Sequence, residues 1–494
     1  MPLEVTCPGE DDWEVRISGR MDAYLEEAVP VVEEIKLCSA KWVPEEVREA
    51  HWAQAVCYGY MRTPDEPEKP VVIRVAYVTR TGAVKKTFEQ QMTAAECGET
   101  FQTLLENWIR RQRILRKHRR ERDASLAGLE FPFPEWRPGQ REMAAQVYTA
   151  IRLRRRLFAS MPTGCGKSSA TLFPALKALG NGMTKQIFYL TARTTQRQGP
   201  TEALRLMRGQ NLRLWTLTLD AKERQCPEHT VCHPDWCPRA KGHYLRDAEA
   251  LEEMMKIEDW TPEAIREMAD RYCLCPFEFS LSLCEVADVV ICDYNYALDP
   301  AVHIRRIFDR PGEVTLLADE AHHLDDRTRE MLGGCVDTGQ IRSLRKVVGQ
   351  AAGRNHKLYK AMTEVIRDAE ALPAEEKLSS VPESLLFAAE DLAAGLLEER
   401  LGNFPWDEAG GKLSDSVTEL LGFVRAMKRD PAEYAWIRQG EKQCRLTAFA
   451  LRVDRYLRET TAPMTGVVCF SATGNTWAVA QNMADSNGFD LIRV

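Results

Sequence analysis

The chain has 494 residues, which predicts roughly two to four domains, and its hydrophobic content of 44% is sufficient for packed cores. Its formal net charge of −7 excludes a uniformly basic nucleic-acid-binding surface, so any such surface must be local. No apolar run approaches the ~18 residues of a membrane span, and no signal pattern opens the chain, which predicts a cytoplasmic protein without membrane partners. The fifteen cysteines are a high and odd count, and in a reducing compartment spaced cysteines indicate metal or cluster binding before disulfides.

Two predicted strands near the N-terminus carry acidic residues. The first, over residues 15–22, ends at Asp22. The second, over residues 31–36, places Glu34 and Lys36 on one face because side chains alternate along a strand. Two acids can hold a hard divalent cation, and a neighbouring lysine can orient or deprotonate water. For the Glu-x-Lys sequence alone, a β-hairpin with charged, solvent-facing residues is the simpler interpretation.

A helix is predicted next, over residues 45–61, with Gln54 and Tyr58 one turn apart on one side. Residues 71–77 and 83–88 then predict a β-hairpin that completes a small sheet.

The ordered set Gly-Arg-x-Asp, Glu-Ile-Lys and Gln-x-x-x-Tyr is more specific than any of its parts. It resembles the PD-(D/E)XK nuclease fold of RecB-like and Cas4-like nucleases. This resemblance implies that Asp22 and Glu34 bind Mg²⁺ or Mn²⁺ and that Lys36 is catalytic. Gln54 and Tyr58 would match the Gln-x-x-x-Tyr element of such nucleases.

A long basic helix follows, with apolar residues at helical spacing from Phe101 to Leu115 and eight Lys or Arg within residues 110–122. This stretch fits contacts with nucleic-acid phosphates, and it fits equally a solvated helix that bridges two domains. A cluster of prolines at 132, 134 and 138 then predicts a domain boundary.

A phosphate cradle is predicted at residues 161–168, Met-Pro-Thr-Gly-Cys-Gly-Lys-Ser. It follows a buried strand at 157–159 and opens a helix at 169–179, so that backbone N–H groups and the helix N-terminus face the phosphates of a nucleotide. Lys167 would reach the β- and γ-phosphates, and the Ser168 hydroxyl would ligate Mg²⁺. A tight turn with a surface lysine is the alternative interpretation of these eight residues alone.

A second phosphate-site signal lies about 150 residues later. An apolar strand that starts at Val314 delivers Asp319 and Glu320 to the carboxyl edge of a sheet, where ligands bind in open α/β sheets. Asp319 is expected to hold Mg²⁺, and Glu320 is expected to orient or deprotonate the attacking water. The order and distance of the two motifs predict an ATP site.

Four cysteines between these motifs are candidate metal ligands: Cys226, Cys232, Cys237 and Cys275. The last of them follows a predicted helical stretch over residues 248–272, and Cys273 is a rival for its position. Four thiolates suit either tetrahedral zinc or a [4Fe–4S] cluster. Paired Cys-x-x-Cys knuckles, which zinc sites favour, are missing from this set.

The rest of the chain predicts a helical insertion and a last strand. Residues 325–456 are rich in helix formers with apolar residues at helical spacing. Residues 466–473 form an apolar strand that ends in Ser-Ala-Thr, with Ser471 and Thr473 at its end.

Four features together resemble superfamily 2 helicases of the XPD/DinG type. They are the sequence Trp-Arg-Pro-Gly-Gln that ends at Gln140, the phosphate cradle, the Asp-Glu-Ala-His sequence and the cysteines. The resemblance implies that the cysteines hold a [4Fe–4S] cluster and that residues 325–456 form an arch over single-stranded DNA. It implies DNA contacts at Thr191 and Arg193, and coupling of ATP to DNA through His322, Ser471 and Thr473. The implied ATP-binding residues are Gln140, Pro162, Thr163, Gly164, Cys165, Gly166, Lys167, Ser168 and Ser169.

The predicted fold class is therefore α/β: a RecA-like parallel-sheet helicase domain with iron–sulfur and arch insertions, preceded by a small α/β nuclease-like domain. The expected segments are a partial nuclease-like domain (1–98), a basic linker helix (99–130), the helicase domain in two parts (131–222 and 281–330), the cluster insertion (223–280), the arch (331–460) and the last strand (461–494). Because about twenty residues precede Asp22 and a second RecA-like domain is missing, we expect a chain truncated at both ends.

The expected function is an ATP-dependent DNA helicase that moves 5′ to 3′ on single-stranded or forked DNA in DNA repair, as a monomer, with ATP, Mg²⁺ and the cluster as cofactors. Two alternatives stay open. One is a truncated DNA-binding or regulatory remnant that does not unwind DNA, and the other is a Mg²⁺-dependent nuclease whose helicase part recruits DNA.

Overall fold

A computed structural model of the chain describes residues 2–9, 13–38, 43–63, 66–162, 164–228, 237–373, 377–400, 410–430, 433–440, 443–472 and 490–493. The chain separates into two compact units. The N-terminal unit consists of Met1–Arg120 with Pro234–Leu245, and the motor unit consists of Glu121–His233 with Arg246–Val494. None of the described helices is both long and apolar enough to cross a membrane.

A small mixed sheet covered by one helix forms the N-terminal unit. Its strand order is β3 (Ala23–Leu25), β4 (Val31–Leu37), β5 (Pro70–Val78) and β6 (Val84–Thr93), and β4 and β5 run parallel. The strands β1 (Pro2–Pro8) and β2 (Glu14–Arg20) form a separate antiparallel pair. The helix α1 (Glu49–Arg62) packs on β4 and β5, and its apolar residues share one core with Val32, Ile73 and Val75.

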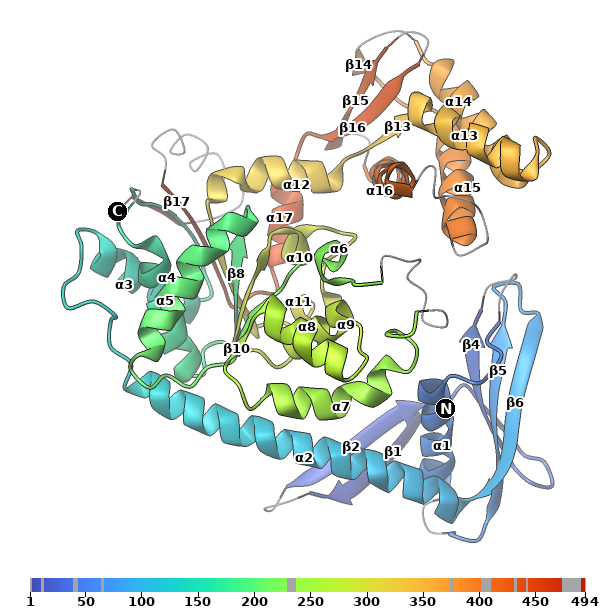
Figure 1. Cartoon of the computed structure of the whole chain (residues 1–494), viewed down its shortest axis with the longest axis horizontal. Coiled ribbons are helices and arrows are strands. Elements are labelled where there is room, and N and C mark those ends of the chain that lie inside the picture. The colour runs from blue at the N-terminus through green and yellow to red at the C-terminus, as the bar shows by residue number, and fades with distance from the viewer. Residues whose placement is uncertain are drawn as a thin grey trace. The chain divides into compact units, whose positions relative to one another are not determined.

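The predicted basic helix is α2, which runs from Ala94 to Ala127 without a break (Figure 1). Its basic residues have different environments. The Arg116 guanidinium lies 4.2 Å from the ring centroid of Trp13, which is a cation–π arrangement. Arg119 and Arg120 are exposed, whereas Arg122 is buried and bonds to Asp288. The basic run therefore includes at least one structural residue.

A parallel sheet forms the centre of the motor unit. Its strands, in chain order, are β7 (Arg156–Ser160), β8 (Gln186–Thr191), β9 (Thr216–Thr218), β10 (Asp259–Trp260), β11 (Val289–Asp293), β12 (Val314–Asp319), β17 (Gly466–Ser471) and β18 (Asp490–Arg493). Their spatial order is β10-β9-β11-β8-β12-β17-β7-β18, and every neighbouring pair is parallel. The prediction of a parallel-sheet α/β fold is confirmed.

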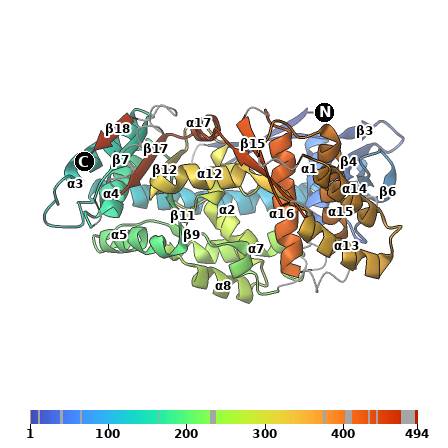
Figure 2. The same cartoon turned by 90° about the horizontal axis from the view of Figure 1, so that it is seen from above.

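Helices α3 (Gln140–Arg152), α4 (Lys167–Gly180) and α5 (Gln198–Arg208) cover one face of this sheet. α3 packs against β7 and β17, which Figure 2 shows together. Every residue of β8, β12 and β17 is buried, as expected for central strands of a parallel sheet that is covered on both faces. The acidic residues of β11 and β12, Asp293 and Asp319, are the last residues of their strands.

The segment between β9 and β11 contains four helices among its described residues: α6 (Lys222–Gln225), α7 (His243–Met254), α8 (Pro262–Arg271) and α9 (Pro276–Cys284). The prediction of one helical stretch over 248–272 is wrong, because the short strand β10 interrupts it. The buried Trp260 pairs there with Leu217 of β9. A new helix then starts where the Thr261 hydroxyl accepts a hydrogen bond from the amide of Ala264, with Pro262 in the first turn.

Short helices α10 (Asn295–Leu298) and α11 (Arg305–Phe308) follow β11. The predicted helical insertion contains α12 (Leu324–Leu332), α13 (Thr338–Ala352), α14 (Lys357–Glu370), α15 (Glu383–Arg400), α16 (Gly410–Met427) and α17 (Asp454–Thr461). It also contains an antiparallel sheet that the sequence analysis missed, in the order β13 (Gly334–Asp337), β16 (Arg445–Ala450), β15 (Tyr434–Gln439) and β14 (Lys377–Leu378). Trp436 of β15 is buried in this insertion.

The buried ion pair between Arg122 and Asp288 gives a stability prediction. Arg122 Nη1 lies 2.6 Å from Asp288 Oδ1, and the amide of Trp215 donates to Asp288 Oδ2. Arg122→Ala leaves a buried carboxylate without its cation, so we expect a loss of about 3–5 kcal/mol in the free energy of unfolding. Urea denaturation followed by tryptophan fluorescence measures it. The control Arg120→Ala, an exposed residue of the same helix, is expected to cost less than about 0.5 kcal/mol, and equal losses in both variants would contradict the assignment.

Candidate functional site

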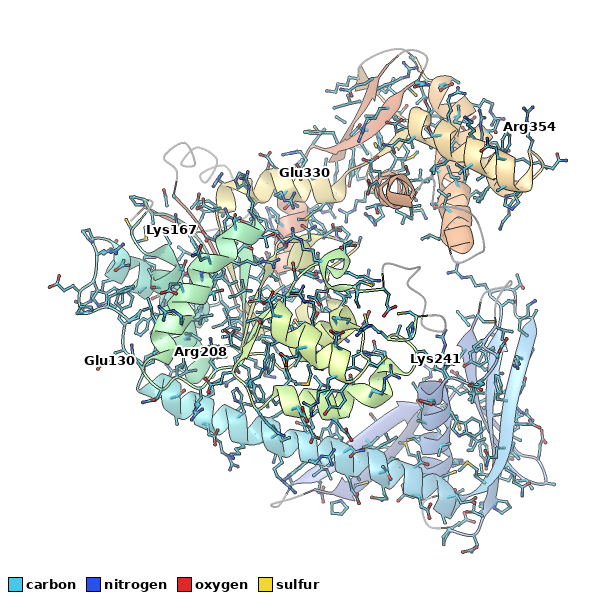
Figure 3. The ribbon with its side chains drawn as sticks, in the orientation of Figure 1. Glu130, Lys167, Arg208, Lys241, Glu330 and Arg354 are labelled. Atoms are coloured by element: carbon cyan, nitrogen blue, oxygen red, sulfur yellow. The ribbon has the colours of Figure 1, made fainter. Side chains whose placement is uncertain are left out.

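The predicted phosphate loop connects β7 to α4, which begins at Lys167 (Figure 3). Gly164 and Gly166 have φ angles of 78° and 75°, which favour glycine. A Cβ at position 166 would also lie 2.5 Å from Gln140 Nε2, so this glycine is required for space as well. The loop thus places the first turn of α4, with Lys167 and Ser168, at the carboxyl edge of the sheet. Thr163 lies outside the described residues.

Gln140, the predicted adenine-contacting residue, is buried at the start of α3. Its Nε2 donates to the carbonyl of Cys165 at 2.6 Å, and its Oε1 accepts from the amide of Arg137 at 2.8 Å. The Arg137 guanidinium bonds to the carbonyl of Gly164. Both residues therefore tie the segment before α3 to the phosphate loop.

The acid pair lies at the same edge of the sheet. Asp319 ends β12, and Glu320 follows it with a left-handed φ of 51°. Glu320 Oε1 lies 3.6 Å from Lys167 Nζ, although the two residues are 153 positions apart in the chain. The amide of Glu320 donates to Asp319 Oδ1 at 2.8 Å. A lysine and two carboxylates at one edge form a site that can bind both phosphate and a hard cation.

The electrostatics of Asp319 follow from its burial. Burial raises the pKa of this carboxyl, and the negative charge of Glu320 raises it further. A hydrogen bond from the Tyr189 hydroxyl and the charge of Lys167 act in the opposite direction and favour the ionised form. A divalent cation at this edge would favour the ionised carboxylate in the same way.

His322 and Ser471 contact each other, as their predicted coupling role requires. His322 Nδ1 lies 2.7 Å from Ser471 Oγ, and Ser471 Oγ lies 3.3 Å from Glu320 Oε2. Partial burial and the neighbouring His323 lower the pKa of His322, which favours the neutral ring at neutral pH. The last strand is thereby linked directly to the acid pair. Thr473 lies outside the described residues.

The two predicted DNA-contacting residues differ in exposure. Thr191 is fully buried at the end of β8, with its hydroxyl 3.4 Å from the carbonyl of Cys292. Arg193 is exposed at the start of the turn that follows. Of the two side chains, only that of Arg193 is presented to solvent.

The structure describes three of the four candidate cluster ligands. Cys226 directly follows α6, and the buried Cys275 directly precedes α9, which packs against α6. Cys237 is buried and is assigned to the N-terminal unit, and Cys232 lies outside the described residues. Cys273, the rival for the fourth position, is exposed. Over the described part of the chain, no group of three or more His, Cys, Asp or Glu is placed to hold a metal ion.

Four of the five nuclease-like residues of the N-terminal unit lie in one hydrogen-bonded network, and Asp22 joins it through the backbone amide of Ile35. Lys36 Nζ donates to Glu34 Oε1 at 2.6 Å and to Gln54 Oε1 at 2.9 Å. Gln54 Nε2 in turn donates to the Tyr58 hydroxyl at 3.0 Å. Asp22 Oδ2 accepts from the amide of Ile35 at 2.8 Å, which holds the acid beside β4. A strand, a bend and α1 thus deliver these side chains to one place.

The buried acid of this network has an unused oxygen. Glu34 is only 3% exposed, and its Oε2 has no hydrogen-bond partner among the described residues. A buried carboxylate oxygen without a donor is costly unless a cation or water satisfies it.

Two residues near the sites were missed by the sequence analysis. His51, one turn before Gln54, bonds through Nδ1 to the Tyr77 hydroxyl, and burial together with the charge of Lys36 lowers its pKa to about 4.

Tyr189 lies in β8, with its hydroxyl between Ser168 and Asp319. No local signal identifies Tyr189, because its partners lie 21 and 130 residues away in the chain.

The fold and the site define an α/β unit with a parallel sheet, a glycine-containing loop before α4 and an adjacent Asp-Glu-Ala-His sequence. Residues 213–341 match the DEAD_2 family. This match and two curated relatives show similarity to helicases over part of the chain.

Two curated relatives illustrate the similarity. The Fanconi anemia group J protein homolog of Gallus gallus is 30% identical over 105 residues, which are 21% of this chain and 8% of that protein. The XPD helicase subunit of general transcription and DNA repair factor IIH from Arabidopsis thaliana is 22% identical over 339 residues, which cover 60% of this chain and 43% of that protein. The chain thus spans less than half the length of these relatives.

Two solved structures are also similar in part. A structure titled "XPD_Helicase" gives a TM-score of 0.48 at 14% identity, covering 73% of this chain and 62% of the other. A structure titled "Truncated XPD" gives a TM-score of 0.46 at 14% identity, covering 71% of this chain and 98% of the other.

Proposed function

We propose that this chain carries the ATP-binding motor of a DNA helicase of the XPD/DinG type. The observation that supports this most directly is the meeting of Lys167 with Glu320 at the sheet edge where the phosphate loop starts α4. Glu320 also lies within residues 213–341, which match DEAD_2, and this likeness supports the proposal.

In the proposed mechanism each residue of the edge has one task. Lys167 and the amides of the loop bind the β- and γ-phosphates, and Glu320 orients or deprotonates the attacking water. Ser168 and Asp319 are the residues that would hold Mg²⁺, which neutralises phosphate charge when it is bound. Gln140 contacts the adenine, and to do so its side-chain amide gives up the hydrogen bond to the carbonyl of Cys165.

Coupling to DNA is assigned to the contact between His322, Ser471 and Glu320. Through this contact, β17 would respond to changes at the acid pair. Arg193, which is exposed in the turn after β8, contacts the DNA backbone. Thr191, which is buried, supports that turn. Movement from 5′ to 3′ on single-stranded or forked DNA, and a role in DNA repair, are part of the proposal through the resemblance to XPD/DinG helicases.

The motor proposal predicts that Lys167→Ala lowers kcat for ATP hydrolysis by about 10²–10³-fold, because a charge that stabilises the developing phosphate charge is lost. Glu320→Gln is expected to lower kcat by about 10²–10⁴-fold with little change in nucleotide binding. Phosphate release is measured with and without single-stranded DNA. Lys185→Ala, an exposed lysine of the same unit, is the control and should leave the rate unchanged. DNA binding without any DNA-stimulated hydrolysis by the parent chain would favour a non-unwinding remnant.

Cys226, Cys232, Cys237 and Cys275 are proposed to hold a [4Fe–4S] cluster. Cys226 directly follows α6 and Cys275 directly precedes α9, and the packing of these two helices on each other supports the assignment. Four thiolates are the ligand set that such a cluster requires. The cluster would stiffen the insertion between β9 and β11.

A metal analysis tests this assignment. The anaerobically purified chain is expected to be brown and to contain iron and sulfide, whereas a zinc site would be colourless. Cys275→Ser is expected to lose the metal. Cys284→Ser, at the other end of the same helix and fully buried, is the matched control and should retain it. Equal metal content in both variants would contradict the role of Cys275.

A second candidate function is Mg²⁺- or Mn²⁺-dependent DNA cleavage by the N-terminal unit. The network of Asp22, Glu34, Lys36, Gln54 and Tyr58, with the unpartnered buried Oε2 of Glu34, favours it. Lys36 is held by Glu34 and Gln54 and would orient the attacking water, and the two acids are the residues that would hold the cation.

Cleavage of labelled DNA in Mn²⁺ and in Mg²⁺ tests this function. Lys36→Ala is expected to lower the cleavage rate by at least about 100-fold, because the lysine that activates water is removed. Lys85→Ala, an exposed lysine on β6, is the control and should cleave normally. If neither metal supports cleavage by the parent chain, the nuclease assignment is wrong.

A further inference from the structure

The side chain of Tyr189 on β8 is fully buried in the core of the motor unit. Its ring packs edge-on against Phe470, with centroids 5.9 Å apart. Its hydroxyl nevertheless contacts two polar groups, Ser168 Oγ at 3.2 Å and Asp319 Oδ2 at 3.0 Å. The hydroxyl therefore lies between two polar side chains that come from other elements of the unit.

The hydrogens around this hydroxyl can be assigned. A phenol has one hydrogen to donate, and Tyr189 donates it to the carboxylate of Asp319. Its oxygen can then only accept from Ser168, so the Ser168 hydrogen points toward Tyr189 and the serine lone pairs point elsewhere. The result is a directed chain from Ser168 through Tyr189 to Asp319.

The backbone around Asp319 is held in the same manner. Its Oδ1 accepts from the amide of Glu320, and its carbonyl accepts from the hydroxyl of the buried Tyr294. Both carboxylate oxygens of Asp319 therefore have a donor. Because Ser168 and Asp319 come from different elements, α4 and β12, the Tyr189 hydroxyl is the direct link between their side chains.

We propose that Tyr189 is a positioning residue for the divalent cation that accompanies ATP. It fixes the Ser168 hydroxyl with its lone pairs available to the cation, and it holds the Asp319 carboxylate in the matching orientation. This inference rests on the proposed ATP-binding function, and it adds a residue on β8 that touches neither nucleotide nor metal.

Tyr189→Phe keeps the ring and its packing on Phe470 and removes only the hydroxyl. Binding of a fluorescent ATP analogue is measured as a function of Mg²⁺ concentration. The Mg²⁺ concentration for half-maximal effect is expected to rise about tenfold, the change that corresponds to one lost charge-assisted hydrogen bond. Affinity for the metal-free nucleotide should stay within about twofold of the parent value. An unchanged Mg²⁺ dependence would overturn the inference.

Two further variants make the test specific. Tyr148→Phe removes the hydroxyl that accepts from Asn181 Nδ2 on the surface of the same unit, and it should leave the Mg²⁺ dependence unchanged. In a Ser168→Ala background, Tyr189→Phe should have a smaller effect than in the parent chain, because half of its action is already lost. Fully additive effects would show that Tyr189 does not act through Ser168.

The outcomes separate this inference from the motor proposal. If the parent chain binds no nucleotide even with Mg²⁺, both are wrong. If the parent binds Mg²⁺-nucleotide and Tyr189→Phe behaves identically, only the role of Tyr189 is wrong. Should Tyr189→Phe fail to fold by circular dichroism, fluorotyrosine at 189, which keeps the hydroxyl but alters its acidity, should still shift the Mg²⁺ dependence. No shift in that variant would overturn the inference.

Discussion

The chemistry of the motor unit depends on one pairing constraint: β12 lies between β8 and β17, and β17 lies beside β7. Because all these strands are parallel, their carboxyl ends share one edge. The phosphate loop leaves β7 at this edge, and the acid pair leaves β12 at the same edge. Lys167 and Glu320 meet only because this register is maintained.

The same constraint explains why polar groups are concentrated at the strand ends. The central strands are buried throughout, so a polar side chain within them is costly unless it has a hydrogen-bond partner. Tyr189, which lies within β8, satisfies this requirement by bonding to Asp319 and Ser168. The contacts of Tyr189 thus serve both the packing of the core and the geometry of the site, so a change at this residue alters both.

The two units use a lysine and acids in different ways. In the motor unit Lys167 stands 3.6 Å from Glu320, beyond hydrogen-bond distance, so this lysine is less tightly held than Lys36. In the N-terminal unit Lys36 is held at 2.6 Å by Glu34 and also by Gln54 of α1, so its position is fixed before any ligand arrives. The first arrangement suits phosphate binding, and the second suits orientation of water.

The sequence by itself determined the elements whose signals are local. The glycine-rich turn between a buried strand and a helix, and the acids after an apolar strand, are visible within a few residues of each other. The parallel fold was predicted from the resemblance to XPD/DinG-type helicases that these motifs carry. The order Asp22, Glu34, Lys36, Gln54 and Tyr58 likewise predicted a set that the structure brings into contact.

Only the tertiary structure decided the contacts between distant residues. The role of Tyr189, the burial of Thr191 and the pairing of Arg122 with Asp288 all depend on which strand lies beside which, and local periodicity does not contain that information. The antiparallel sheet in the helical insertion was missed for the same reason: its strands are short, and β13 pairs with β16 more than 100 residues later. A strand is stabilised by hydrogen bonds to its neighbour, and which strand is the neighbour depends on the whole tertiary structure.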